Sequence, residues 1–262
     1  MKYLKNTTFL ILALLWTAAL PAEIYETYNM DELYGHLKPG MLVVFDIDNT
    51  LIDPVQELGS NQWFENRIKE YLSYGYSSHD ALQTALKEWT AIQSITVVKL
   101  VEPGIDGIVK DLQEKGYKVM GLTTRGLSLS TRTVEQLESV GVDLRPTAPT
   151  QEEVFFMNER GVLFRGGTLF TAATHKGEAL RKLLEAAGHR PDSIMFINDK
   201  YSDLVPVEEF CTQAGIPYVG LRYGYTDEKV KNFRKQIAEV QFYHFGHILS
   251  DDAAERILHE RG

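Results

Sequence analysis

Apolar runs of strand length alternate with segments of helical periodicity over most of the chain. The run Met41–Phe45 is uninterrupted, which is typical of a strand covered on both faces. Because strands that alternate with helices form right-handed βαβ units, we expect an α/β fold with three layers around a parallel sheet. Further strands are expected at 117–122, 193–197 and 218–221, short hairpin strands at 154–157, 162–165 and 168–171, and helices at 105–115, 129–140 and 176–187.

A segment with a different pattern follows the first predicted strand. Apolar and aromatic residues recur at helical spacing over 61–72 and again over 78–92. We therefore predict a small helical cap at residues 57–100, inserted into a core that comprises residues 23–56 and 101–262. The aromatic residues of the two helices are interpreted as packing residues and not as ligand contacts.

The first 22 residues have the pattern of a secretory signal peptide. Lys2 and Lys5 precede the apolar run Phe9–Leu20. This run is short for a membrane anchor, the alternative interpretation, which needs about 20 apolar residues. We expect cleavage after Ala22 or after Ala19, a periplasmic or secreted product, and no stable membrane span after processing.

Length and charge narrow the classes of function. A chain of 262 residues suffices for one sizeable α/β domain with a small insert. A formal net charge of -9 disfavours binding to a phosphate backbone, so we expect no nucleic-acid binding. The single cysteine, Cys211, cannot form an internal disulfide and is interpreted as a buried thiol on a helix.

Candidate chemistry begins where the first predicted strand ends. Asp46 and Asp48 are two residues apart, and residues at this spacing in an extended segment point the same way. Both carboxylates can therefore enter one pocket at the carboxyl end of the sheet, where open α/β sheets bind ligands. Two adjacent carboxylates repel each other, and a hard divalent cation with oxygen ligands is the simplest relief.

Four short motifs, taken in order, resemble those of the haloacid dehalogenase (HAD) superfamily. The first is Asp46-x-Asp48-x-Thr50 after an apolar strand. The other three are Thr123-Thr124-Arg125, Lys176 in Lys176-Gly177-Glu178, and Asn198-Asp199 followed by Asp203. Each of them follows a predicted strand or begins a predicted helix. The resemblance covers roughly residues 41–221. The layout is similar to secreted bacterial acid-phosphatase-like and uncharacterised HAD proteins.

The resemblance implies a Rossmann-like HAD core and a magnesium-dependent phosphomonoester hydrolase. In such an enzyme Asp46 would attack phosphorus to form an aspartyl-phosphate, and Asp48 would act as general acid and then general base. Asp203 would orient the waters around Mg²⁺. The metal would be bound by Asp46, Asp48 (through its backbone carbonyl) and Asp199, and the phosphoryl oxygens would contact Thr123, Arg125 and Lys176.

Two other functions remain open at this point. One is a phosphotransferase of the same fold, in which an alcohol replaces water in the second step. The other is a non-catalytic secreted module that binds a phosphorylated ligand, although such a module would not need all of Asp46, Asp48, Lys176 and Asp199. Asn198 departs from the HAD pattern, where Gly or Asp is common. The expected partner is a small-molecule or protein phosphate.

Overall fold

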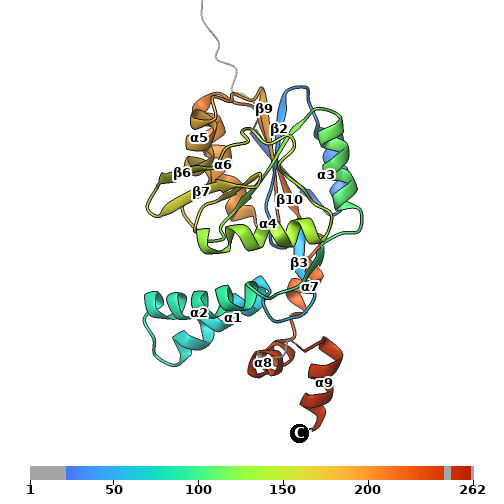
Figure 1. Cartoon of the computed structure of the whole chain (residues 1–262), viewed down its shortest axis with the longest axis vertical. Helices are drawn as coiled ribbons and strands as arrows, with labels where there is room; N and C mark the ends of the chain where they lie inside the picture. The colour runs from blue at the N-terminus through green and yellow to red at the C-terminus, as the bar shows by residue number, and fades with distance from the viewer. Residues whose placement is uncertain (1–21, 245–248, 261–262) are drawn as a thin grey trace, which may run out of the picture.

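The computed structural model describes residues 22–244 and 249–260 of the chain (Figure 1). The predicted signal peptide, residues 1–22, lies outside the described residues except for Ala22. None of the described helices is both long enough and apolar enough to cross a membrane.

A mostly parallel sheet forms the centre of the described chain and confirms the predicted fold class. Its strand order is β1-β10-β9-β2-β5-β8-β7-β6, and only the pairs β8–β7 and β7–β6 are antiparallel. The strands are β1 (Ala22–Thr27), β2 (Met41–Phe45), β5 (Lys118–Thr123), β6 (Val154–Met157), β7 (Gly161–Arg165), β8 (Thr168–Phe170), β9 (Ser193–Asn198) and β10 (Tyr218–Tyr223).

Helices cover both faces of the sheet, so the fold has three layers (Figure 1). One face packs against η1, α3 and α4, and the other against α5 and α6. The short segment η2 precedes α4. The bounds are η1 (Met30–His36), α3 (Ile105–Glu114), η2 (Leu127–Leu129), α4 (Ser130–Ser139), α5 (Lys176–Ala186) and α6 (Tyr201–Ala214).

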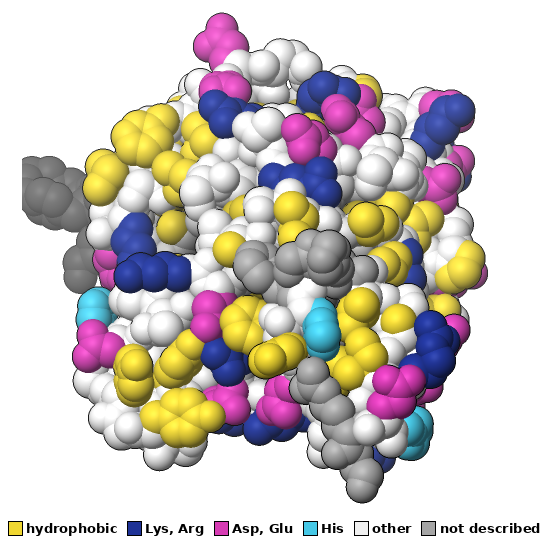
Figure 2. Space-filling view, turned by 60° about the horizontal axis from the view of Figure 1, so that its bottom comes forward, with side chains coloured by type: hydrophobic (Ala, Val, Ile, Leu, Met, Phe, Trp, Pro, Cys, Tyr) yellow, Lys and Arg dark blue, Asp and Glu magenta, His cyan; other side chains and the backbone are white. Residues whose placement is uncertain are grey.

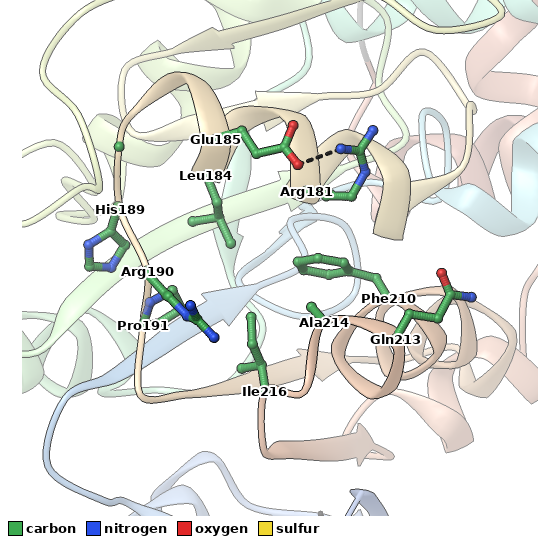
Figure 3. A pocket seen from close by; sticks show the side chains of 11 residues that line it. Arg181, Leu184, Glu185, His189, Arg190, Pro191, Phe210, Gln213, Ala214 and Ile216 are labelled. Atoms are coloured by element: carbon green, nitrogen blue, oxygen red, sulfur yellow. Dashed lines mark hydrogen bonds and ion pairs between the residues drawn. The ribbon is translucent and has the colours of Figure 1, made fainter.

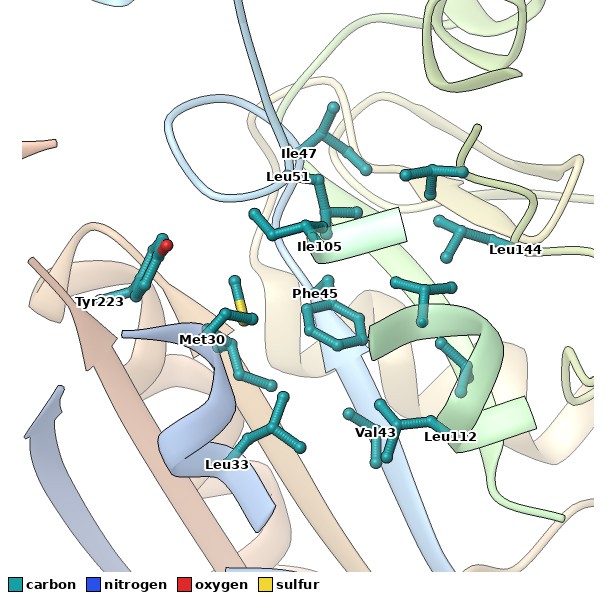
Figure 4. Packing of buried hydrophobic residues seen from close by; sticks show 14 of the residues in the cluster. Met30, Leu33, Val43, Phe45, Ile47, Leu51, Ile105, Leu112, Leu144 and Tyr223 are labelled. Atoms are coloured by element: carbon teal, nitrogen blue, oxygen red, sulfur yellow. The ribbon is translucent and has the colours of Figure 1, made fainter. Parts of the chain in front are cut away.

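Strand β2 supplies core residues to both layers because its side chains alternate between the two faces. Val43 and Phe45 pack with η1 and α3, as Figure 4 shows for Leu33 and Leu112. Leu42 and Val44 pack with α5 and α6 on the opposite face. All five residues of β2 are buried, which explains why its sequence is an uninterrupted apolar run.

The neighbouring strands β9, β2 and β5 end at the same edge of the sheet. The backbone N–H of Asp46, the first residue after β2, donates to the carbonyl of Ile197 in β9 at 2.9 Å. Phe45 is paired with Gly121 in β5, two residues before Thr123. The loops that carry three of the four sequence motifs therefore meet at this edge.

Two helices lie beyond this edge, in the segment where the sequence predicts a cap (Figure 1). They are α1 (Asn61–Ser73) and α2 (Ser78–Gln93), and the side chains of Ser60 and Ser77 accept hydrogen bonds from their first turns. A two-stranded ribbon, β3 (Ile52–Pro54) with β4 (Val98–Leu100), connects the pair to the core.

The helices described after β10 are α7 (Asp227–Lys231), α8 (Lys235–Tyr243) and α9 (Asp251–Glu260). Of these, α8 contacts the insert helix α1, which the sequence pattern does not predict. The rings of Trp63 in α1 and Phe242 in α8 have centroids 5.3 Å apart. Gln241 accepts a hydrogen bond from the backbone N–H of Leu58 at 2.9 Å. On the face formed by these helices, cationic and anionic side chains are interspersed with hydrophobic ones (Figure 2).

Candidate active site

Asp46 and Lys176 form a buried ion pair at the carboxyl edge of the sheet. The Nζ atom of Lys176 lies 2.9 Å from Oδ1 of Asp46 and 2.7 Å from Oδ2 of Asp203. Asp46 keeps 7% of its surface exposed and Lys176 keeps 3%. Because an ammonium has three N–H donors, one donor of Lys176 remains for another group.

The first turn of α5 positions Lys176. His175 caps this helix, with its Nδ1 accepting from the backbone N–H of Glu178 at 3.2 Å. Gly177 lies against α6, where an added Cβ atom would come within 2.0 Å of the carbonyl oxygen of Pro206. The glycine therefore permits the close packing that brings Lys176 next to Asp203 in the first turn of α6.

Asp199 is held by a residue that the sequence analysis did not select. Nδ2 of Asn49 donates to Oδ2 of Asp199 at 3.1 Å. Asn49 has a left-handed backbone (φ 58°), a conformation that asparagine tolerates better than most residues. The sequence could have indicated Asn49 as a site residue, because it lies between Asp48 and Thr50 in the first motif.

The carboxylates of this cluster outnumber its cations. Burial raises the pKa of Asp46 from 3.8 to about 7; Lys176 opposes the rise, and Asp199 and Asp203 add to it. Burial likewise raises the pKa of Asp199 to about 6, against the hydrogen bond from Asn49. Burial disfavours the charged ammonium of Lys176, but Asp46 and Asp203 outweigh this and raise its pKa. Burial and mutual repulsion therefore disfavour the charged forms of these carboxyl groups.

The stability of the metal-free protein should fall as the pH rises. A carboxyl whose pKa is higher in the folded state than in the unfolded state stabilises the fold most below the unfolded pKa, and this contribution is lost as the pH passes the folded pKa. For Asp46 that window runs from about 3.8 to about 7. Between pH 5 and pH 8 in EDTA, we expect a loss on the order of 2–4 kcal/mol in the free energy of unfolding.

Urea titrations at several pH values would measure this loss. Asp46→Asn should weaken the pH dependence, because asparagine does not titrate. An equally steep dependence in this variant would assign the effect to other groups.

The donor set fits a magnesium ion. Oδ2 of Asp46 and Oδ1 of Asp199 accept no hydrogen bond from the described residues. No three acidic, histidine or cysteine side chains converge on one point in the described ranges, so a cation would need other ligands as well. Mg²⁺ usually takes one or two carboxylates and keeps several waters, which matches two free carboxylate oxygens beside excess negative charge.

Asp48 is paired with Arg125 in a second buried cluster. Nη2 of Arg125 lies 2.7 Å from Oδ1 of Asp48, and Nε lies 2.8 Å from Oδ2, so the contact is bidentate. Nη1 of Arg125 donates to Thr133 at 2.9 Å and to Gln136 at 2.6 Å, and Nη2 also approaches Gln93 at 3.3 Å. All five N–H donors of this guanidinium therefore have protein partners.

This arrangement gives Arg125 protein partners where the sequence predicts a phosphate contact. Its side chain is 1% exposed and faces Asp48, so it has no free donor for a phosphate. The sequence motif located the residue but not the direction of its side chain. Gln93, Thr133 and Gln136 were also missed. Thr133 and Gln136 are three apart on the buried face of α4, and this polar pair on a buried face was the only signal.

Thr123 and Thr124 have different surroundings. Thr123, the last residue of β5, is 1% exposed, and its Oγ1 accepts from the backbone N–H of Arg125 at 3.2 Å. Its hydroxyl hydrogen can still be donated. Thr124 is exposed and lines a cavity beside Asp48. The predicted contact between Thr123 and a phosphoryl group remains a prediction.

The cavity next to Asp48 has a volume of about 380 Å³. Its walls come from α1 and α2 on one side and from the loops after β2, β5 and β8 on the other, and they include Asp48 and Arg125 but not Asp46. A second cavity of about 570 Å³ lies near the amino end of β9, between α5 and α6 (Figure 3). None of the four motif segments lines this second cavity.

Comparison with known proteins places the chain in a family. The model of the family described as "Protein of unknown function (DUF2608)" matches residues 26–255. The chain belongs to this family. A "Putative outer membrane protein" of Chlamydia muridarum (strain MoPn / Nigg) is 26% identical over 257 residues, which is 97% of each chain. One of the same name from Chlamydia trachomatis serovar D is 25% identical and covers 84% of this chain and 82% of the relative.

Solved structures similar to this DUF2608 chain include HAD-type proteins. A haloacid dehalogenase-like hydrolase from Streptococcus pneumoniae has a TM-score of 0.45 at 14% identity, covering 75% of this chain and all of the other. A class C acid phosphatase from Bacillus anthracis has a TM-score of 0.35 at 16% identity, covering 87% and 81%. These likenesses concern the fold, and the site residues must support any proposal about activity.

Proposed function

We propose that this protein is a magnesium-dependent phosphomonoester hydrolase that acts through an aspartyl-phosphate on Asp46. The observation that carries the proposal is the buried cluster of Asp46, Lys176 and Asp199 at the carboxyl edge of the parallel sheet. Each carboxylate oxygen has two acceptor sites, so Asp46 can contact the cation through one oxygen and attack phosphorus with the other, and Lys176 lies beside it to stabilise the charge of a phosphoryl group.

The first step transfers the phosphoryl group to the protein. An oxygen of Asp46 attacks phosphorus, the bond from phosphorus to the ester oxygen breaks, and the leaving oxygen takes a proton from Asp48, which enters this step as the neutral acid and leaves it as the carboxylate paired with Arg125. The third N–H donor of Lys176 and the hydroxyl of Thr123 bind phosphoryl oxygens. In the second step a water attacks phosphorus, Asp48 takes its proton, and phosphate leaves Asp46.

Arg125 acts in this proposal by positioning Asp48. Each carboxylate oxygen has two acceptor sites, so the bidentate contact leaves one site on each oxygen of Asp48 for a leaving group or a water. Gln93, Thr133 and Gln136 fix the guanidinium, and the guanidinium fixes the carboxylate. We thus replace the predicted phosphate contact of Arg125 with a positioning role.

Asp46, Asp199 and the backbone carbonyl of Asp48 would hold the magnesium ion. A divalent cation there supplies charge that offsets the phosphoryl oxygens and the two carboxylates. Asp203 contacts the ammonium of Lys176 directly, and this contact is the observation that supports a role for Asp203 at the site. Its predicted place near the waters of the metal remains part of the proposal.

The proposal includes the location and organisation of the chain. The signal-peptide pattern of residues 1–22 supports a periplasmic or secreted product. The helices α1 and α2, which wall the cavity beside Asp48, support a cap at residues 57–100 on a core of residues 23–56 and 101–262.

Purified protein should hydrolyse phosphomonoesters with magnesium and lose this activity with EDTA. We expect added Mg²⁺ to restore turnover in a phosphate-release assay, because Asp46 and Asp199 would otherwise repel the substrate. Magnesium should also raise the melting temperature at pH 8 in the absence of substrate, and Asp199→Asn should abolish that rise. Full activity in excess EDTA would contradict the metal assignment.

A further inference from the structure

The cavity beside Asp48 has one chemically distinct wall. Phe64 of α1 and Leu82, Leu86 and Trp89 of α2 line it from the side of the insert, and the lining as a whole is mostly apolar. Phe64, Leu82 and Leu86 are only half-buried although they lie next to the core. Apolar surface of these side chains therefore faces the cavity, where no side chain of the described chain covers it.

The aromatic pair on this wall is ordered. The rings of Phe64 and Trp89 have centroids 5.7 Å apart and are tilted by 50°, a geometry that aromatic pairs favour. Trp89 is further fixed by its Nε1, which donates to the carbonyl of Gly59 at 3.2 Å. The guanidinium of Arg125 lies 5.5 Å from the ring centroid of Trp89. The apolar wall thus begins directly beside the Arg125–Asp48 pair.

Polar and charged groups line the cavity elsewhere. Lys200 and Glu65 form an ion pair at 3.0 Å, and both side chains are about half exposed. Because they neutralise each other, this pair offers little attraction to a second charge on a substrate. Arg160 also lines the cavity, on the side away from α1 and α2, and its Nη1 donates to the carbonyl of Ala172 at 3.2 Å. An apolar body in the cavity would instead remove the wall and itself from water, which is favourable in proportion to the area covered.

We infer that this site selects phosphomonoesters whose leaving group carries an apolar body about the size of one aromatic ring. The inference rests on the proposed function, because it places the leaving oxygen at Asp48. The body of the leaving group then lies against Leu86, Phe64 and Trp89. A cavity of about 380 Å³ is large enough for a ring and its linker. A polyhydroxylated body would bury hydroxyls against this wall without partners, which is unfavourable.

Three substrates with the same reacting group test this inference. Ethyl phosphate, 2-phenylethyl phosphate and glucose 6-phosphate are all esters of a primary alcohol and differ mainly in the body of the leaving group. We expect kcat/KM for 2-phenylethyl phosphate to exceed that for ethyl phosphate by roughly 10- to 100-fold, and glucose 6-phosphate to be no better than ethyl phosphate.

Two matched variants test whether the apolar wall causes the preference for the phenylethyl ester. Leu86→Asn should lower the ratio of kcat/KM between 2-phenylethyl and ethyl phosphate by about 5- to 10-fold, because it removes part of the apolar wall. Leu72→Asn makes the same change on α1 at an exposed side chain outside the cavity, and should keep the wild-type ratio. If Leu86→Asn does not fold, as judged by circular dichroism, Leu86→Ala removes apolar atoms from the wall without adding a polar group, and should give a smaller change in the same direction.

The outcomes separate the inference from the function on which it rests. Equal kcat/KM values for the phenylethyl and ethyl esters, or a preference for glucose 6-phosphate, would overturn the inference and leave the hydrolase proposal in place. The same drop in ratio for Leu72→Asn would also overturn it. Failure to hydrolyse any of the three esters with magnesium would contradict the proposed function, and the inference with it.

Discussion

Replacing Asp46 with asparagine should abolish the phosphoenzyme and reduce turnover by about 10⁴- to 10⁶-fold, the range seen when a covalent nucleophile is removed. Asparagine has nearly the same shape, but its amide cannot attack phosphorus as a carboxylate does. Lys176 keeps its contact with Asp203, so the fold should survive. Trapping with a radiolabelled phosphomonoester, followed by acid quench, measures the intermediate directly.

Asp48→Asn provides the comparison, because it should keep the nucleophile and lose the acid and base. We expect phosphate binding to persist and both steps to slow by roughly 10²- to 10⁴-fold. Aryl phosphates should lose less in the first step than alkyl phosphates, since their leaving groups need less protonation. An acid-stable phosphoprotein formed by Asp46→Asn would place the nucleophile elsewhere and refute the central proposal.

Arg125→Met should cause the largest loss of stability among substitutions near the site. It leaves the carboxylate of Asp48 buried without its bidentate partner, and breaking a buried pair in this way typically costs about 3–5 kcal/mol. It also removes the common partner of Gln93, Thr133 and Gln136. Urea denaturation of the purified variant would measure the change in the free energy of unfolding.

A surface arginine and a double variant serve as controls for this prediction. Arg145 pairs with Asp143 and Glu138 where all three side chains are about half exposed, so Arg145→Met should cost less than about 1 kcal/mol. Adding Asp48→Asn to Arg125→Met should recover part of the loss, because the uncompensated charge is gone. Equal losses in Arg125→Met and Arg145→Met would show that the buried pair does not stabilise the fold.

The sequence pattern predicts the sheet well where burial alone determines the residues. The apolar run Met41–Phe45 coincides with β2 because both faces of that strand are covered. The pattern does not predict β1, whose residues Ala22–Thr27 mix polar and apolar types at the edge of the sheet. It also gives no sign that α8 packs on α1, because that contact depends on two faces from opposite ends of the chain.

The sequence predicted the position of the candidate site better than the direction of its side chains. The ends of β2, β5 and β9 meet once the parallel sheet is assumed, which brings three of the four motifs together, and the fourth, Lys176, comes from the first turn of α5. The partner of Arg125 could not be read from its motif, because Gln93 and Gln136 come from separate helices. Side-chain direction at such a position is set by tertiary contacts and not by local sequence.

The contact between α8 and α1 also affects when the site can form during synthesis. Helix α1 packs Trp63 against Phe242, and Arg234 pairs with Glu57 at 2.8 Å, at the entry to the insert. These partners lie about 180 residues later in the chain. The helices that wall the cavity must therefore wait for almost the entire polypeptide before they can complete their packing. The central sheet is complete at Tyr223 and can assemble first, and the packing around the cavity follows only after the last helices have emerged.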